Sequence, residues 1–255
     1  MDSKTLVVTT SVSGNTIETL TVLDSAKKIN CKLVAFSDGG KMKEYCIKNN
    51  IEHRDIPLYH SPRGSFPSYL FSILKVLQPV IPIKNEDIVE SIANLKDLQG
   101  KISSSNLGSD NPAIELGQWV TNIPIIYYPS GLQAAAVRFK NSLQENAKMH
   151  AMMEDVIEAS HNGMVAWEKE SDAMPILIRG HDDYIKTKER WDIIKEYFEQ
   201  REIEYREIFS IRGSILSKLI NLIYLLDYST IYRSVMSGVD PTPVETIDFI
   251  KSKTA

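Results

Sequence analysis

The sequence predicts an α/β protein in which mostly parallel sheets are covered by helices. Short apolar runs alternate with longer amphipathic stretches along nearly the whole chain, which is the pattern of parallel strands joined by helical crossovers. Glycine, proline and hydroxyl residues gather where an apolar run passes into a helical stretch. The chain has 255 residues, 43% of them hydrophobic, which is enough for one large core or two smaller cores.

In the first part of the chain, short strands are separated by helices. The predicted elements are strands at 5–9, 32–36 and 52–56 and helices at 16–28, 41–49, 69–77 and 85–98. A segment rich in proline and glycine, 57–67, precedes the apolar third helix, and a break at 78–82 follows it. Serine, glycine and asparagine predict a loop at 103–112.

The second part repeats the alternation. The predicted elements are strands at 123–128, 174–179 and 202–208 and helices at 132–153, 159–167, 183–200, 213–236 and 244–251. Two rigid turns at Asp240-Pro241-Thr242-Pro243 precede the last helix. We therefore expect two α/β lobes, 1–95 and 96–255, with a single doubly wound domain as the alternative.

Composition excludes several classes of protein. The 29 basic and 33 acidic residues give a net charge of −4, so nothing marks a surface for nucleic acid or an anionic membrane. The longest apolar stretch, 215–226, is interrupted by Ser217, Lys218 and Asn221, which argues against a membrane-spanning helix. The two cysteines form no metal-ligand pattern, and no signal peptide is evident. A cytoplasmic location is expected.

A cluster of hydroxyl residues lies where the first strand turns into a helix. Ser11, Ser13 and Thr16 surround Gly14 at this junction. The first N–H groups of a helix lack intrahelical partners and, with the helix dipole, favour an anion. The residues therefore predict a phosphate site. The alternative is that Ser13 or Asn15 simply caps the helix.

Two further loops could contribute to such a site. The turn around Gly39 follows the next strand at the same end of the sheet, where parallel sheets bind ligands; alternatively it is only a tight connection that needs glycine. Arg63 lies in a flexible loop before an apolar helix, where it could bind phosphate or stabilise an oxyanion. A solvated surface arginine is the alternative.

Two titratable residues in the second half are candidates for proton transfer. Helical spacing places Glu145 at the flank of an apolar face, where a helical ion pair with Lys148 is the simpler interpretation. His161 is followed by Asn162 and Gly163 at an expected element boundary, a setting that a cleft can reach. A structural histidine is the alternative.

These segments together resemble the archaeal-type bifunctional phosphoglucose/phosphomannose isomerases, which are built from sugar isomerase (SIS) domains. In chain order, the resembling segments are Ser11-Val12-Ser13-Gly14-Asn15-Thr16, 36–41, Pro62-Arg63, 138–148, His161-Asn162, 240–244 and Lys251. They follow the family's order over nearly the whole chain. The resemblance implies two SIS lobes of the three-layer α/β/α kind.

The resemblance also implies a reaction. Glucose 6-phosphate or mannose 6-phosphate would interconvert with fructose 6-phosphate through a cis-enediol, without a metal or other cofactor. Matched residues would have these roles: Ser11, Ser13 and Thr16 bind phosphate; Glu145 is the base; His161 opens the ring; Arg63 stabilises the enediolate; Lys251 contacts the ring oxygen or hydroxyls; Gly39 and Thr242 lie near the substrate. In this family the histidine comes from the neighbouring subunit, so a homodimer is expected.

The sequence departs from the family pattern in several places. Relatives have a glycine-rich turn of the Gly-Gly-Ser-Gly kind before the hydroxyl cluster, and we expect this chain to lack it together with its strand and helix. Val12, Gln144 and Gly163 also replace residues that are commoner in the family. A non-catalytic sugar-phosphate-binding homologue is therefore an alternative, although Glu145 and His161 argue against it. The isomerase half of a glucosamine 6-phosphate synthase would need further domains.

Overall fold

The computed structural model describes residues 1–254, which fold into two compact units. One contains Met1–Ile83 and the segment from Glu245 onward, and the other contains Lys84–Val244. The division into lobes at residue 95 stays a prediction.

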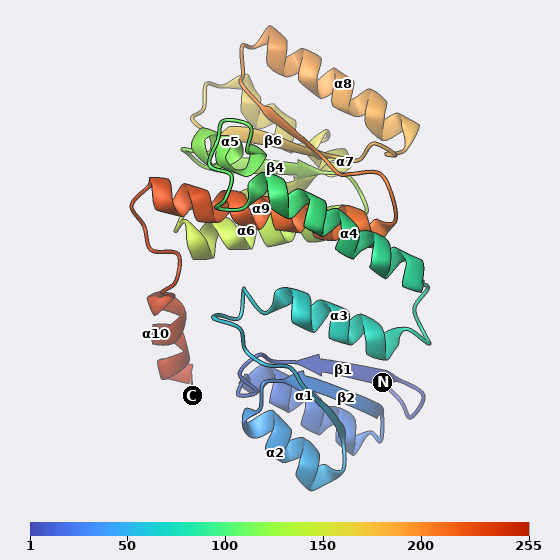
Figure 1. The fold of residues 1–255 in the computed structure, drawn as a ribbon. Helices are drawn as coiled ribbons and strands as arrows, with labels where there is room; N and C mark the ends of the chain where they lie inside the picture. The colour runs from blue at the N-terminus through green and yellow to red at the C-terminus, as the bar shows by residue number, and fades with distance from the viewer. Residues whose placement is uncertain (255) are drawn as a thin grey trace. The chain divides into compact units, whose positions relative to one another are not determined.

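The first unit is a small three-layer structure. Its elements are β1 (Leu6–Thr10), α1 (Ile17–Lys28), β2 (Lys32–Ser37), α2 (Gly40–Asn49), β3 (Glu52–Asp55), α3 (Phe66–Leu77) and α10 (Glu245–Thr254). The three strands are parallel in the order β1-β2-β3. Successive β2 residues face opposite sides: Ala35 packs with Leu23 and Met42 of α1 and α2, and Phe36 packs with Tyr69 of α3. Figure 1 shows α1 and α2 on one side of the strands and α3 on the other.

The second unit contains a four-stranded parallel sheet in the order β5-β4-β6-β7. Its elements are α4 (Asn85–Ile102), α5 (Pro112–Trp119), β4 (Pro124–Tyr128), α6 (Gln133–Asn146), β5 (Met152–Asp155), α7 (Val156–Ala159), the 3₁₀ helix η1 (Gly163–Glu168), β6 (Met174–Arg179), α8 (Ile185–Gln200), β7 (Arg206–Phe209) and α9 (Ile215–Met236). Figure 1 shows α8 on one face of this sheet and α6 with α9 on the other.

The core on the α8 face is built around aromatic side chains. Tyr127 of β4 and Leu177 of β6 pack against Trp167, Trp191 and Phe198. The Trp167 Nε1–H donates to Tyr127 Oη at 2.8 Å, so this buried pair satisfies its polar atoms. Both units are therefore helix-covered parallel sheets, which confirms the expected three-layer α/β/α class.

The predicted helix at 132–153 is wrong in its second half. Helix α6 ends at Asn146, and Met152–Asp155 forms strand β5, which pairs with β4. Lys148 adopts a left-handed conformation with φ of 56°, a conformation that ends a helix. The sequence also predicts a loop at 103–112 with no helix after it. In the structure, helix α5 begins at Pro112, with Asn111 as its cap.

Candidate active site

The hydroxyl cluster lies in the connection between β1 and α1, as the sequence predicts. Ser11 Oγ and Thr16 Oγ1 are 2.8 Å apart and share a hydrogen bond. Ser11 is buried whereas Ser13 and Thr16 are exposed. Thr16 is the N-cap of α1, but its side chain makes no capping hydrogen bond. The residue at the cap position is thus Thr16, whereas the capping alternative expects Ser13 or Asn15, and the Thr16 hydroxyl bonds Ser11.

The β1–α1 loop and the Gly39 turn pack closely against each other. Gly14 has φ of 68°, and a Cβ atom on it would lie 1.9 Å from the carbonyl oxygen of Gly39. Gly40 has φ of 64°, and its Cβ would lie 2.4 Å from the Ser13 carbonyl oxygen. The Met42 N–H donates to the Gly14 carbonyl at 2.9 Å. The structure therefore brings Ser11, Thr16 and Gly39 together at the carboxyl ends of β1 and β2.

Replacing Gly14 by alanine is expected to destabilise the first unit by about 3 kcal/mol and to weaken phosphate binding, because a left-handed alanine is strained and its Cβ overlaps the facing backbone. Urea unfolding and phosphate titration measure the two effects. Gly100→Ala is the matched control: this glycine lies inside α4 with open space at its Cβ position, so the change should stabilise by about 0.5–1 kcal/mol. Equal effects of the two changes would contradict this account of Gly14.

His53 supports the Gly39 turn, a contribution that sequence reasoning missed. Its Nε2 lies 2.7 Å from the buried Ser37 Oγ, which also accepts from the Gly39 N–H. The His53 side chain is only 7% exposed, and its Nδ1 lies 3.4 Å from Asp55. Burial lowers the pKa of His53, and the nearby Asp55 carboxylate only partly opposes this. The residue was not identifiable from sequence because its contact depends on the register that pairs His53 with Ala35.

A stability loss at mildly acidic pH follows. With the folded pKa below the ordinary 6.5, the unfolded chain binds more protons in this window, so the free energy of unfolding rises with pH. The contribution is complete above pH 6.5 and is lost as the pH falls below that value toward the folded pKa. Urea midpoints measured between about pH 5 and 8 should show this slope. His53→Gln should flatten it, whereas His150→Gln, at an exposed position, should not.

Arg63 and Lys251 also belong to the first unit. The loop that carries Arg63 is closed by Ser65, whose Oγ accepts from the Tyr59 N–H at 2.9 Å and donates to the Ser61 carbonyl at 3.1 Å. Arg63 is half-buried beside it. Lys251 is exposed near the end of α10. Their roles toward a substrate stay predictions.

Glu145 lies in the last turn of α6. The Lys148 ammonium donates to the backbone carbonyl of Glu145 and, at 2.7 Å, to that of Pro243. Lys148 therefore bonds the end of α6 to the 240–244 turn. This contact differs from the ion pair with Glu145 that the sequence suggests. The neighbouring Thr242 N–H donates to Asp240 Oδ1 at 2.8 Å. The structure thus places Thr242 close to the helix end that carries Glu145, although the sequence separates them widely.

A polar ladder fixes α6 against α9. Arg138 donates from Nε and Nη2 to the Asp227 carboxylate at 2.8–3.1 Å. Ser142 Oγ donates to the same carboxylate at 2.6 Å, and Asn146 Nδ2 donates to Thr230 Oγ1 at 2.9 Å. Positions 138, 142 and 146 are four residues apart and share one helix face. This face sets the position of α6 and, with it, of Glu145.

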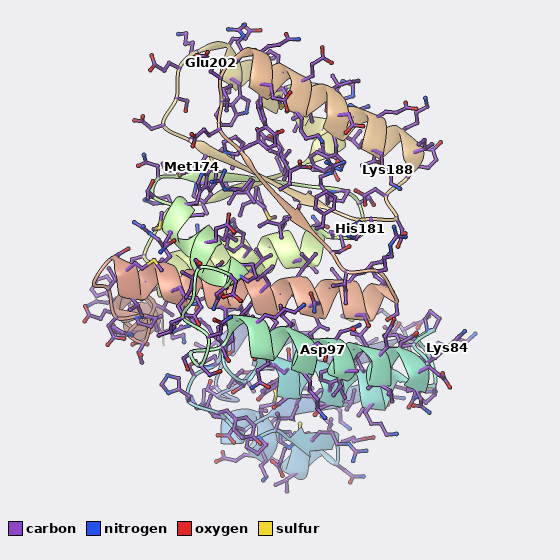
Figure 2. The ribbon with its side chains drawn as sticks, turned by 45° about the horizontal axis from the view of Figure 1, so that its top comes forward. Lys84, Asp97, Met174, His181, Lys188 and Glu202 are labelled. Carbon is purple, nitrogen blue, oxygen red and sulfur yellow. The ribbon has the colours of Figure 1, made fainter. Side chains whose placement is uncertain are left out.

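His161 and Glu145 lie at opposite ends of β5. Helix α6 runs from the carboxyl end of β4 to the amino end of β5, and Glu145 lies in its last turn. His161 comes after the carboxyl end of β5. His161 is exposed, and the adjacent Asn162 accepts from the Gly163 N–H and donates to Glu158. Strand β4 lies between β5 and the parallel strand β6. Figure 2 labels Met174 at the start of β6 and His181 just after its end.

Comparison with known proteins identifies the family. The family model for the bacterial phospho-glucose isomerase C-terminal SIS domain matches residues 109–254. A bifunctional phosphoglucose/phosphomannose isomerase of Caldicellulosiruptor bescii is 33% identical over 267 aligned residues, covering 100% of this chain and 78% of its own. The chain belongs to this SIS isomerase family.

A second relative and two solved structures are also similar to the chain. The enzyme of the same name from Aquifex aeolicus is 26% identical and covers 99% of this chain and 77% of its own. Among solved structures, tagatose-6-phosphate ketose/aldose isomerase from Escherichia coli has a TM-score of 0.71 at 15% identity, covering 96% of this chain and 72% of its own. A glucose-6-phosphate isomerase like protein from Thermus thermophilus has a TM-score of 0.63 at 14% identity, with coverages of 94% and 83%. At such identities these two structures support the fold alone.

Two further observations concern the described part of this SIS chain. No helix within residues 1–254 is both long and apolar enough to cross a membrane. Among the same residues, no group of three or more His, Cys, Asp or Glu side chains is placed to hold a metal ion.

Proposed function

We propose that the chain is a metal-independent aldose-ketose isomerase of the cytoplasm that interconverts glucose 6-phosphate or mannose 6-phosphate with fructose 6-phosphate. The observation that carries the proposal is the full-length similarity to relatives named bifunctional phosphoglucose/phosphomannose isomerase. The hydroxyl pair at the start of α1 supports it, because a phosphate bound there would fix the sugar through a group remote from the reaction.

The reaction divides among the proposed residues. Ser11, Ser13 and Thr16 bind the phosphate, next to the Gly39 turn. His161 moves the proton that opens the ring, and Glu145 then removes the proton from C2. The C–H electron pair passes into a cis-enediolate, whose oxygen charge Arg63 stabilises.

A proton then passes from the C2 hydroxyl oxygen to O1, and Glu145 returns its own proton to C1, which leaves the ketone at C2 and a hydroxyl at C1. Lys251 contacts the ring oxygen or hydroxyls, and Thr242 lies near C1 and C2. Since the enediol has lost the configuration at C2, the two C2 epimers share one intermediate.

A homodimer with a shared site supports this chemistry. Glu145 and His161 lie at opposite ends of β5 within one chain. A partner subunit that supplies His161 would let the two side chains act on the same substrate molecule. Mixing tests the idea directly. Glu145→Gln and His161→Ala chains, each inactive alone, should regain about a quarter of wild-type activity when subunits are randomly exchanged, because half the dimers then hold one intact site. Gel filtration at the monomer mass, or no recovery after demonstrated exchange, would contradict the shared site.

Turnover tests the main proposal. Purified protein is incubated with fructose 6-phosphate in the presence of EDTA, and both glucose 6-phosphate and mannose 6-phosphate are followed. Both products should form at rates unaffected by the chelator. Formation of neither would refute the enzyme for this chain. Phosphate binding that survives Ser11→Ala with Thr16→Ala would refute the role of the hydroxyl cluster, with Thr21→Ala, an exposed residue further along α1, as the control.

A further inference from the structure

The second unit has a small cavity that shares no residue with the proposed isomerase site. Its volume is about 210 Å³, and its polar lining includes Ser130, Asp182, Asp183, Thr187, Ser210 and Lys218. These residues come from the loops and helices that follow β4, β6 and β7. The cavity therefore lies at the carboxyl edge of the sheet; in Figure 2, His181 and Lys188 mark the loop and helix after β6.

The cavity lies between β4 and β6, where the connections between strands reverse their direction across the sheet. The connection after β4 leads to β5 on one side, and the connection after β6 leads to β7 on the other. Adjacent crossovers that diverge in this way leave a crevice outside the strand ends, where open α/β sheets bind ligands. Two long helices, α6 and α8, begin at this edge, and neither has a side-chain cap on its first N–H groups.

A buried hydroxyl in the cavity wall lacks a partner. Ser210 is 0% exposed, and its Oγ has no hydrogen-bond partner among the described residues. Its backbone N–H is satisfied, because it donates to the Arg179 carbonyl at 2.8 Å. Leaving a hydroxyl buried and unpaired destabilises a fold. Ser210 lines the cavity, so rotation of its side chain to another staggered rotamer would let a ligand there provide the missing partner.

Both acidic and basic side chains lie around the cavity. Lys218 Nζ lies 2.9 Å from Asp182, which also lies 3.4 Å from Arg212. Asp183 accepts from the Gly180 N–H at 3.0 Å and from Trp191 Nε1 at 3.2 Å. Lys218, by its hydrogen bond, lowers the pKa of Asp182. Carboxylate, ammonium and hydroxyl groups therefore line one small volume.

We propose that this cavity binds a small uncharged polyhydroxylated molecule, such as a free monosaccharide or a sugar alcohol. Each hydroxyl of such a ligand both donates and accepts, which suits a wall of carboxylates beside an ammonium, serine hydroxyls and helix N–H groups. Lys218 and Arg212 pair with Asp182, whereas Asp183 accepts from the neutral Gly180 N–H and Trp191 Nε1–H. A phosphate dianion would lie beside the Asp183 charge, and like charges at short range repel, so the Asp183 carboxylate favours a neutral ligand.

The indole of Trp191 reports on the site. The chain has three tryptophans, so its ¹⁵N spectrum has three indole N–H signals, and only that of Trp191 donates to a residue of the cavity wall, Asp183. Titration with glucose, fructose and sorbitol should shift the Trp191 signal saturably and leave those of Trp119 and Trp167 unchanged. The shift should persist in Ser11→Ala, which separates this site from the proposed phosphate site. No saturable shift with any of the three, or a shift with inorganic phosphate alone, would overturn the proposal.

Ser210→Ala gives two effects of opposite sign. Removing the unpaired hydroxyl should raise the Tm of the unliganded protein by about 2–4 °C, yet weaken sugar binding by about tenfold because the ligand loses a partner. Asp182→Asn is a second variant, at a solvent-accessible position, and should weaken binding similarly. Unchanged affinity in both variants would overturn the assignment of the cavity.

Discussion

Replacing Glu145 by glutamine is expected to lower kcat for hexose phosphate isomerisation by about 10²–10⁴-fold, the usual contribution of a positioned general base. Glutamine keeps the shape of the side chain and cannot accept the C2 proton. KM should change little, because the proposed phosphate contacts lie elsewhere, in the β1–α1 loop. Initial rates from fructose 6-phosphate over a range of concentrations measure both constants.

The control for Glu145 is another glutamate on a helix. Glu189→Gln removes an exposed carboxylate that pairs with Lys186 at i,i+3, so kcat should stay within twofold or so of wild type. Solvent deuterium exchange gives a second readout: wild type should exchange the C1/C2 proton, and Glu145→Gln should not. A drop of less than about tenfold in kcat would remove Glu145 from the role of base.

Replacing Asp227 by alanine is expected to destabilise the second unit by about 3 kcal/mol. The carboxylate accepts from Arg138 at two nitrogens and from Ser142, and both charged side chains are only about one-fifth exposed, at 20% and 21%. Removing Asp227 takes this carboxylate away from a largely desolvated guanidinium, which costs more than the pair contributes. Urea unfolding followed by circular dichroism measures the loss.

A double change separates the lost pair from the unpaired charge. Arg138→Leu combined with Asp227→Leu should recover most of the stability, because no charge then remains buried. Asp192→Ala is the surface control, since this carboxylate is 67% exposed and should cost less than about 0.5 kcal/mol. If Asp227→Ala cost no more than Asp192→Ala, the ladder between α6 and α9 would not stabilise the unit.

Most strands and helices were predictable because local periodicity and burial coincide. The strand at 174–179 occurs as predicted, since its apolar run is buried on both faces. The error after α6 has a tertiary cause. Apolar residues continue at helical spacing, and no glycine marks the end; Lys148 takes the left-handed conformation itself, with its ammonium bonded to Pro243. That partner is distant in the sequence, so no local pattern indicates it.

The candidate site was predictable in parts. The hydroxyl cluster and the Gly39 turn come together because both follow neighbouring parallel strands, a relation that the strand order alone predicts. The support from His53 and the link from Lys148 to the 240–244 turn required the register and the tertiary fold. Helix α5 had a visible start in Asn111-Pro112, where the asparagine side chain accepts from the Ala113 and Ile114 N–H groups, within a stretch assigned to a loop.

The grouping of α10 with the first unit has a consequence for synthesis on the ribosome. Met1–Ile83 emerges early, but the helix that carries Lys251 is translated only after all of Lys84–Val244. Domains generally fold in order from the amino terminus as they emerge. The first unit therefore receives α10, and one of its proposed substrate contacts, only after the whole second unit has been translated, so a chain stalled before Glu245 would carry the β1–α1 loop without Lys251.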